Sequence, residues 1–307
     1  MAFTSAREVD TVGEVGSVTS EAKQIERYHS AGGGVVLGVA LGLSLTAVGI
    51  ARHPASIQGA GRGLLLTDIG LLLAYGIVGI CVWYQRRADV SIALRVGTLA
   101  GLVLGTVHVA NHVIEAFVPN RHFALIISPV LLMLALFGVA GSAAWKRTRS
   151  FTLAVIAGVW CAMVAMLILL CFAFSFNLAF EARVELQLYW AFAASGMNDP
   201  GAFVVKNSLE AASEGLVRMP AFAMFTSLAG ALANAWISRR SRTAVLAAAS
   251  VTPLMVVTGV AALSYANSLE RAARPPFVMA GVLLASIAIS FGHPIWSLLR
   301  RTEPGKS

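Results

Sequence analysis

Two histidines and a glutamate in one apolar run have the spacing of a cation or proton site. His108, His112 and Glu115 are four and three residues apart, so a helix would place them on one face. Imidazole nitrogens at this spacing converge on one metal ion, with the carboxylate as a further ligand or as a hydrogen-bond partner. The same residues suit a proton relay, because imidazole titrates near neutral pH. The structural alternative is two neutral histidines that are hydrogen-bonded across a helix interface.

Three glycines precede these residues on the same face. Gly97, Gly101 and Gly105 are spaced by four residues, and His108 follows three residues later. Small residues at this spacing let two membrane helices approach closely. The spacing therefore predicts that this helix packs tightly against a neighbour and brings its histidines into the protein interior.

Carboxylates in other apolar segments need partners as well. A charge at the membrane centre costs at least about 2.5–3.5 kcal/mol, and Asp68 lies between apolar residues in the second run. Arg62, His108 or His112 would be a partner for Asp68 if the second and third runs packed as a hairpin. Glu181 and Glu185 would repel each other at i and i+4, so this pair requires a cation, a shared proton or water.

The elements that position these groups follow from hydropathy. The chain is 57% hydrophobic and 12% charged, against about 25% charged residues in an average soluble protein. Continuous apolar runs of about twenty residues recur, the length of a helix that crosses a bilayer, and their lack of alternation excludes barrel strands. We expect an all-α, polytopic helical membrane bundle of about eight transmembrane helices plus an amphipathic outer helix. The runs are about 32–51, 63–84, 96–117, 123–145, 151–176, 219–238, 243–266 and 277–298.

The runs divide the chain into five parts: a loosely ordered or surface-lying cytoplasmic N-terminal tail (1–31), transmembrane helices 1–5 (32–176), an outer loop (177–218), transmembrane helices 6–8 (219–298) and a cytoplasmic C-terminal tail (299–307). The outer loop contains the turn signal Asn-Asp-Pro-Gly at 198–201. We expect an amphipathic helix over about 202–217 after it. Pro220 then marks the start of the next transmembrane helix.

The basic residues indicate an orientation and exclude a nucleic-acid partner. The net charge is +8, but Lys and Arg lie at the ends of the apolar runs, which leaves no surface for nucleic acid. With the N-terminus inside, 15 of the 23 Lys and Arg residues lie on inner segments. The positive-inside rule therefore places both termini in the cytoplasm of a multi-pass membrane protein.

Three functions from different classes fit these features. The first is an ion- or small-solute-handling, transporter-like protein whose partner is the lipid bilayer and whose site lies toward the outer side. The second is a membrane metalloprotein or redox subunit that holds a divalent metal on His108 and His112. The third is a structural subunit that packs against other membrane subunits through its glycine faces. The sequence motifs do not decide whether the chain is an enzyme. The candidate site residues are Asp68, His108, His112, Glu115, Glu181 and Glu185.

Overall fold

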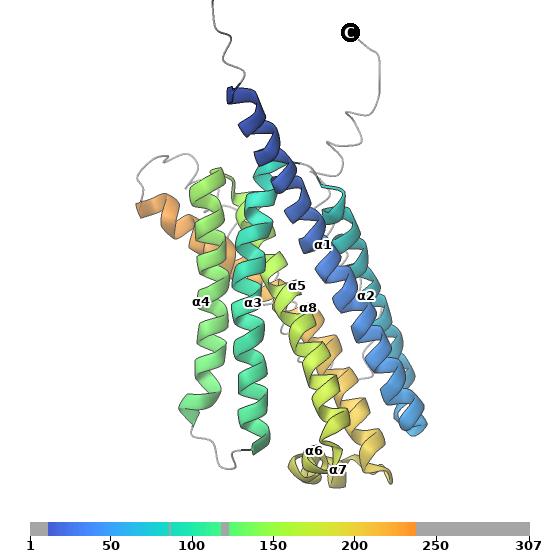
Figure 1. The fold of residues 1–307 in the computed structure, drawn as a ribbon. Helices are drawn as coiled ribbons and strands as arrows, with labels where there is room; N and C mark the ends of the chain where they lie inside the picture. The colour runs from blue at the N-terminus through green and yellow to red at the C-terminus, as the bar shows by residue number, and fades with distance from the viewer. Residues whose placement is uncertain (1–11, 86, 118–122, 238–307) are drawn as a thin grey trace, which may run out of the picture.

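The structure, a computed structural model, describes residues 12–85, 87–117 and 123–237. Figure 1 shows these residues as a bundle of long helices with two short helices across one end, and the described part contains no strand. In chain order the elements are α1 (Val12–Arg52), η1 (Pro54–Ile57), α2 (Gly61–Trp83), α3 (Ala88–Phe117), α4 (Phe123–Thr148), α5 (Phe151–Ala179), α6 (Glu181–Gln187), α7 (Tyr189–Ser195) and α8 (Pro200–Ile237).

Within the described residues, 5 helices are long and apolar enough to cross a membrane. They are Ala31–Arg52, Gly61–Trp83, Ala88–Ile114, Phe151–Ala179 and Pro200–Trp236. The all-helical class is thus confirmed for the described residues, and these apolar helices indicate a multi-pass membrane protein. The expected total of about eight spans is not tested, because the predicted runs 243–266 and 277–298 and the tail 299–307 lie outside the described residues.

Helix α5 is the centre of the bundle. It packs against α3, α8, α4 and α1, and its mid-section includes several fully buried side chains, among them Trp160 and Ile156. A helix that is apolar on all sides is stable only when it is surrounded by other apolar surface. Its first turn is fixed by Ser150, whose Oγ accepts a hydrogen bond from the backbone N–H of Leu153 at 3.3 Å.

The glycine face of α3 is confirmed as a packing face, and its neighbour is α5. A Cβ added to Gly97 would lie 2.5 Å from the carbonyl oxygen of Ala157, and one added to Gly101 would lie 2.7 Å from that of Cys161. At Gly105 it would lie 2.9 Å from Ile168 Cδ1. Only hydrogen fits at the first two positions, because the obstructing atoms belong to the backbone.

The second and third runs do not pack as a hairpin, the arrangement under which His108 or His112 would have been a partner for Asp68. Helix α2 packs against α1 and α8, whereas α3 packs against α5 and α4. The backbone contact between the α3 glycines and α5 explains this choice, because it buries the face that a hairpin would have turned toward α2. Asp68 and the two histidines of α3 consequently belong to different interfaces.

Two segment boundaries also differ from the expectation. Helix α1 begins at Val12, so the tail expected over 1–31 is helical from that point. Residues 12–30 are rich in good helix formers, and extending an existing helix costs no new nucleation. Helix α8 runs unbroken through Pro220. The expected separate amphipathic helix is therefore the first half of α8, and it is docked in the bundle, where Leu209 and Leu216 are fully buried.

The short elements gather at one end, which we call the η1 end. It holds η1, α6, α7 and the start of α8. Helix α7 stops where Gly196 adopts a φ of 70°, a conformation that favours glycine. Asp199 then begins α8, since its Oδ1 accepts a hydrogen bond from the backbone N–H of Ala202 at 3.0 Å. The predicted turn signal thus lies at the start of this helix.

Substitution of the α3 glycines tests the central packing. Gly97→Ala and Gly101→Ala should each lower stability by about 1–3 kcal/mol, because the new methyl group collides with the α5 backbone. Gly70→Ala is the matched control, since a Cβ at Gly70 meets nothing within 4 Å. Thermal unfolding followed by circular dichroism in detergent measures the effect. Gly97→Ala and Gly70→Ala proteins of equal stability would contradict the packing.

Candidate functional site

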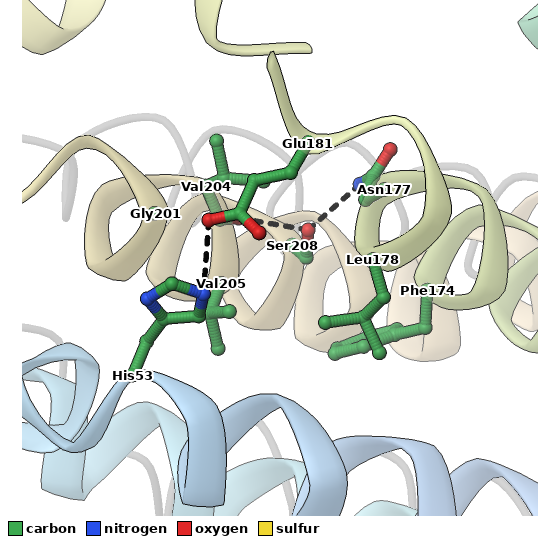
Figure 2. A pocket seen from close by; sticks show the side chains of 9 residues that line it. All are labelled: His53, Phe174, Asn177, Leu178, Glu181, Gly201, Val204, Val205 and Ser208. Atoms are coloured by element: carbon green, nitrogen blue, oxygen red, sulfur yellow. Dashed lines mark hydrogen bonds and ion pairs between the residues drawn. The ribbon is translucent and has the colours of Figure 1, made fainter. Parts of the chain in front are cut away.

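A histidine–carboxylate pair lies at the η1 end. His53 Nε2 and Glu181 Oε1 are 2.9 Å apart, and the side chains are 18% and 31% exposed. His53 immediately follows α1, and Glu181 is the first residue of α6. Figure 2 shows the two side chains pointing toward each other across the start of α8. The pair therefore joins the end of α1 to the segment that follows α5.

Local sequence explains why both residues lie where helices end. Pro54 begins η1, and a residue before proline is disfavoured in the helical region, so His53 leaves the axis of α1 with ψ 71°. Phe180 separates α5 from α6 with φ −117° and ψ 39°. The guanidinium of Arg52 donates a hydrogen bond to the carbonyl oxygen of Leu178 at 3.3 Å. This bond holds the ends of α1 and α5 side by side.

The start of α8 closes the pair from the other side. Asp199 Oδ1 is 3.9 Å from His53 Nδ1, so the imidazole lies between two carboxylates. A Cβ on Gly201 would overlap both the His53 ring and the Glu181 carboxylate. Glycine is therefore required at this position for His53 and Glu181 to meet over the α8 backbone.

A small cavity lies behind the ion pair. Its volume is about 10 Å³, room for roughly one water molecule. Asn177 and Ser208 line it, and Asn177 Nδ2 donates a hydrogen bond to Ser208 Oγ at 2.9 Å (Figure 2). The Oδ1 atom of Asn177 is buried and has no hydrogen-bond partner among the described residues. The cavity thus presents a buried acceptor next to the Glu181 side chain.

Asp68 is the buried carboxylate of the described bundle. Its side chain belongs to a residue that is 2% exposed, and its Oδ1 atom is buried without a hydrogen-bond partner among the described residues. Asp68 lies seven residues before Tyr75, hence on the same face of α2. The Tyr75 hydroxyl donates to the carbonyl oxygen of Leu216 at 2.8 Å, so this face of α2 is directed toward α8.

The register of α1 against α2 places Thr46 opposite Asp68. Close contacts join Val35 to Gly79 and Gly42 to Leu72, as expected for two antiparallel helices. One turn further along α1 and one turn back along α2, the facing residues are Thr46 and Asp68. Thr46 is also buried, with 4% exposure. From Thr46 to His53 the rise is roughly 10 Å, which places Asp68 about two turns inside the His53–Glu181 pair.

His112 lies in an aromatic setting. Its ring centroid is 5.4 Å from that of Phe176 and 6.2 Å from that of Phe172, both in edge contacts. His108, one turn earlier on α3, is half-buried. Helices α3 and α1 both pack against α5. Their contacts along α5 place these histidines and Asp68 at a similar height along the bundle axis. The histidines lie across α5 from Asp68, so Asp68 and the histidines do not form one site.

The structure leaves the predicted metal site untested. Among the described residues, no group of three or more His, Cys, Asp and Glu side chains is arranged to hold a metal ion. The side chain of Glu115 lies outside the described residues, so the full set with His108 and His112 stays a prediction.

Glu181 and Glu185, which the sequence presents as a pair, lie in different surroundings. Glu181 contacts His53, which gives its carboxylate a hydrogen-bonding partner outside α6. Glu185 is half-buried one turn further along α6. The sequence reasoning did not select His53. The available signal was its position between Arg52 and Pro54, at the end of the first apolar run.

Comparisons of the chain with protein-family models, with curated proteins and with solved structures find no match. The site is therefore interpreted from its own geometry.

Neutralising each glutamate of α6 separately tests the ion pair. Glu181→Gln should destabilise the protein by about 1 kcal/mol, because it removes the charge opposite His53 at a half-buried position. Glu185→Gln is the matched control on the same helix and should have a smaller effect. Thermal unfolding in detergent, with a His53→Gln double-mutant cycle, measures the coupling. Additive effects of His53→Gln and Glu181→Gln would contradict the pair.

Proposed function

We propose that this chain is an ion- or small-solute-handling membrane protein, and that Asp68 takes up and releases the proton or cation. The observation that carries this proposal is the buried Asp68 carboxylate, which has an oxygen without a partner in a candidate span. A charge in such a place costs several kcal/mol unless it is compensated. Ionisable groups kept inside membrane bundles therefore mark ion and proton pathways.

The polar groups between Asp68 and the η1 end support a path to that end. His53 and Glu181 lie at the entrance, and Asn177 and Ser208 line the cavity behind them. Imidazole, carboxylate and hydroxyl groups both accept and donate protons as their charge state allows. Two helical turns, roughly 10 Å, separate this entrance from Asp68, so the proposed path would need a chain of about three hydrogen-bonded water molecules.

The proposal assigns different roles to the two predicted clusters. Glu181 belongs to the entrance, together with His53, which the sequence reasoning had not selected. His112 stabilises the α3–α5 interface through its aromatic contacts. The metalloprotein alternative, with His108, His112 and Glu115 as ligands, is not tested by the described residues.

Proton movement in reconstituted liposomes tests the proposal. The full chain, in liposomes that contain a pH-sensitive dye and carry a potassium–valinomycin potential, should acidify or alkalinise the lumen faster than empty liposomes. Asp68→Asn should reduce this rate to that of empty liposomes, because an amide side chain does not ionise at neutral pH.

Asp89→Asn is the matched control for this experiment. Asp89 lies at the start of α3, is 41% exposed and forms an ion pair with Arg87 at 2.7 Å, so its loss should leave the flux unchanged. A full-rate Asp68→Asn protein, or a parent chain that moves neither protons nor Na⁺ in the same liposomes, would contradict the proposal.

A further inference from the structure

Helix α7 is an uncharged, aromatic helix with no buried residue. It runs from Tyr189 to Ser195 with the sequence YWAFAAS. Trp190 is 82% exposed and Tyr189 is 54% exposed. A soluble surface rarely displays adjacent large aromatic side chains to this extent, and an exposed apolar patch of this kind marks a contact with another phase or another molecule.

Neighbouring residues extend this apolar surface along the η1 end. Leu186 in α6 is 67% exposed, and Phe180, just before α6, is 48% exposed. Figure 1 shows α6 and α7 at the end of the bundle, seen nearly along their axes, whereas the long helices run up the page. Both short helices therefore lie across the bundle axis, in the orientation of a helix parallel to a membrane plane.

Two sets of contacts fix this segment to the bundle. Arg183 donates from Nε to the carbonyl oxygen of Ala116 at 2.9 Å, and its guanidinium lies 5.7 Å from the Phe117 ring centroid. Phe192 packs against Phe203 of α8, with ring centroids 5.8 Å apart. The segment is thus anchored to α3 and α8, and this anchoring leaves Tyr189 and Trp190 on the outside.

We propose that α7 binds the lipid bilayer at its interface, with Tyr189 and Trp190 at the boundary between headgroups and acyl chains. Tyr and Trp prefer this boundary because their rings are apolar and their O–H and N–H groups bond to water or headgroups. The candidate spans also expose apolar side chains, such as Leu66 and Leu37. A bilayer covers both surfaces at once, whereas a protein partner would have to cover α7 alone.

Interfacial binding of α7 would fix the depth of the polar entrance. Glu181 begins the helix that precedes α7, and His53 contacts it directly. Both would then lie at headgroup level, where water reaches them. The inference itself rests on the exposure and anchoring of α7 and not on proton movement through Asp68.

Fluorescence quenching by brominated lipids tests this inference. The parent chain and the Trp190→Phe variant are reconstituted in phosphatidylcholine vesicles whose acyl chains carry bromine either near the glycerol or near the chain end. The difference between their emission spectra gives the contribution of Trp190. Because Trp190 is exposed, its replacement should leave the circular dichroism spectrum unchanged.

The expected result is a Trp190 contribution that is quenched more by the shallow bromines than by the deep ones, and little by aqueous iodide. Trp160→Phe provides the control, since Trp160 is fully buried and its contribution should resist iodide. Quenching by iodide alone would place α7 in water and overturn the inference. Resistance to all three quenchers would also overturn it, because a protein surface or a second copy of the chain would then cover Trp190.

Discussion

The close contact between α3 and α5 determines the arrangement of the described bundle. Gly97 and Gly101 have no side chain, so the α3 backbone lies close enough to α5 that an added Cβ would collide with the α5 carbonyl oxygens. Since α5 is apolar on all sides, α4, α1 and α8 cover its remaining faces. Helix α2 then packs outside α1 and α8, away from α3. One interface thus separates Asp68 from His108 and His112, although all three lie at a similar level.

The polar interior of the described part is concentrated on the α1, α2 and α8 side. Most of the buried polar side chains are in these helices or in η1, namely Thr46, Ser56, Thr67, Asp68, Ser208, Ser213 and Ser227. Buried hydroxyl groups in helices satisfy themselves with the backbone one turn earlier, as Thr67 and Ser208 do. Asp68 has no such local solution, because a carboxylate only accepts hydrogen bonds from N–H or O–H groups. On this side of the bundle, Asp68 is therefore the group that we propose binds a cation or a proton.

Hydropathy and spacing predicted the membrane class, the glycine face and the start of α8 near Pro200. These features are local, since each depends on residues within one helix or one turn. The sequence did not predict which helices are neighbours. Packing of α3 on α5 instead of α2 is a long-range choice, and hydropathy does not distinguish between two equally apolar partners. The sequence therefore left open whether Asp68 lies beside the histidines of the third run.

His53 shows the second limit of the sequence reasoning. A histidine at the end of an apolar run is indistinguishable from any other polar residue in a connection, and its partner Glu181 is far away in the chain. Only the fold brings them within 2.9 Å. The glycine that permits this contact, Gly201, was visible in the sequence as part of a turn signal. Its role in admitting the two side chains depends on the docking of α8 against α1.

Infrared difference spectroscopy tests most directly whether Asp68 exchanges a proton inside the bundle. Spectra of the full chain in lipid are recorded across a pH step, and the carbonyl band of a protonated carboxyl group is compared between variants. The band should appear and disappear with pH in the parent and in Asp89→Asn, and it should be absent from Asp68→Asn. A parent spectrum without a titrating carboxyl band, or an unchanged band in Asp68→Asn, would contradict the proposed role of Asp68.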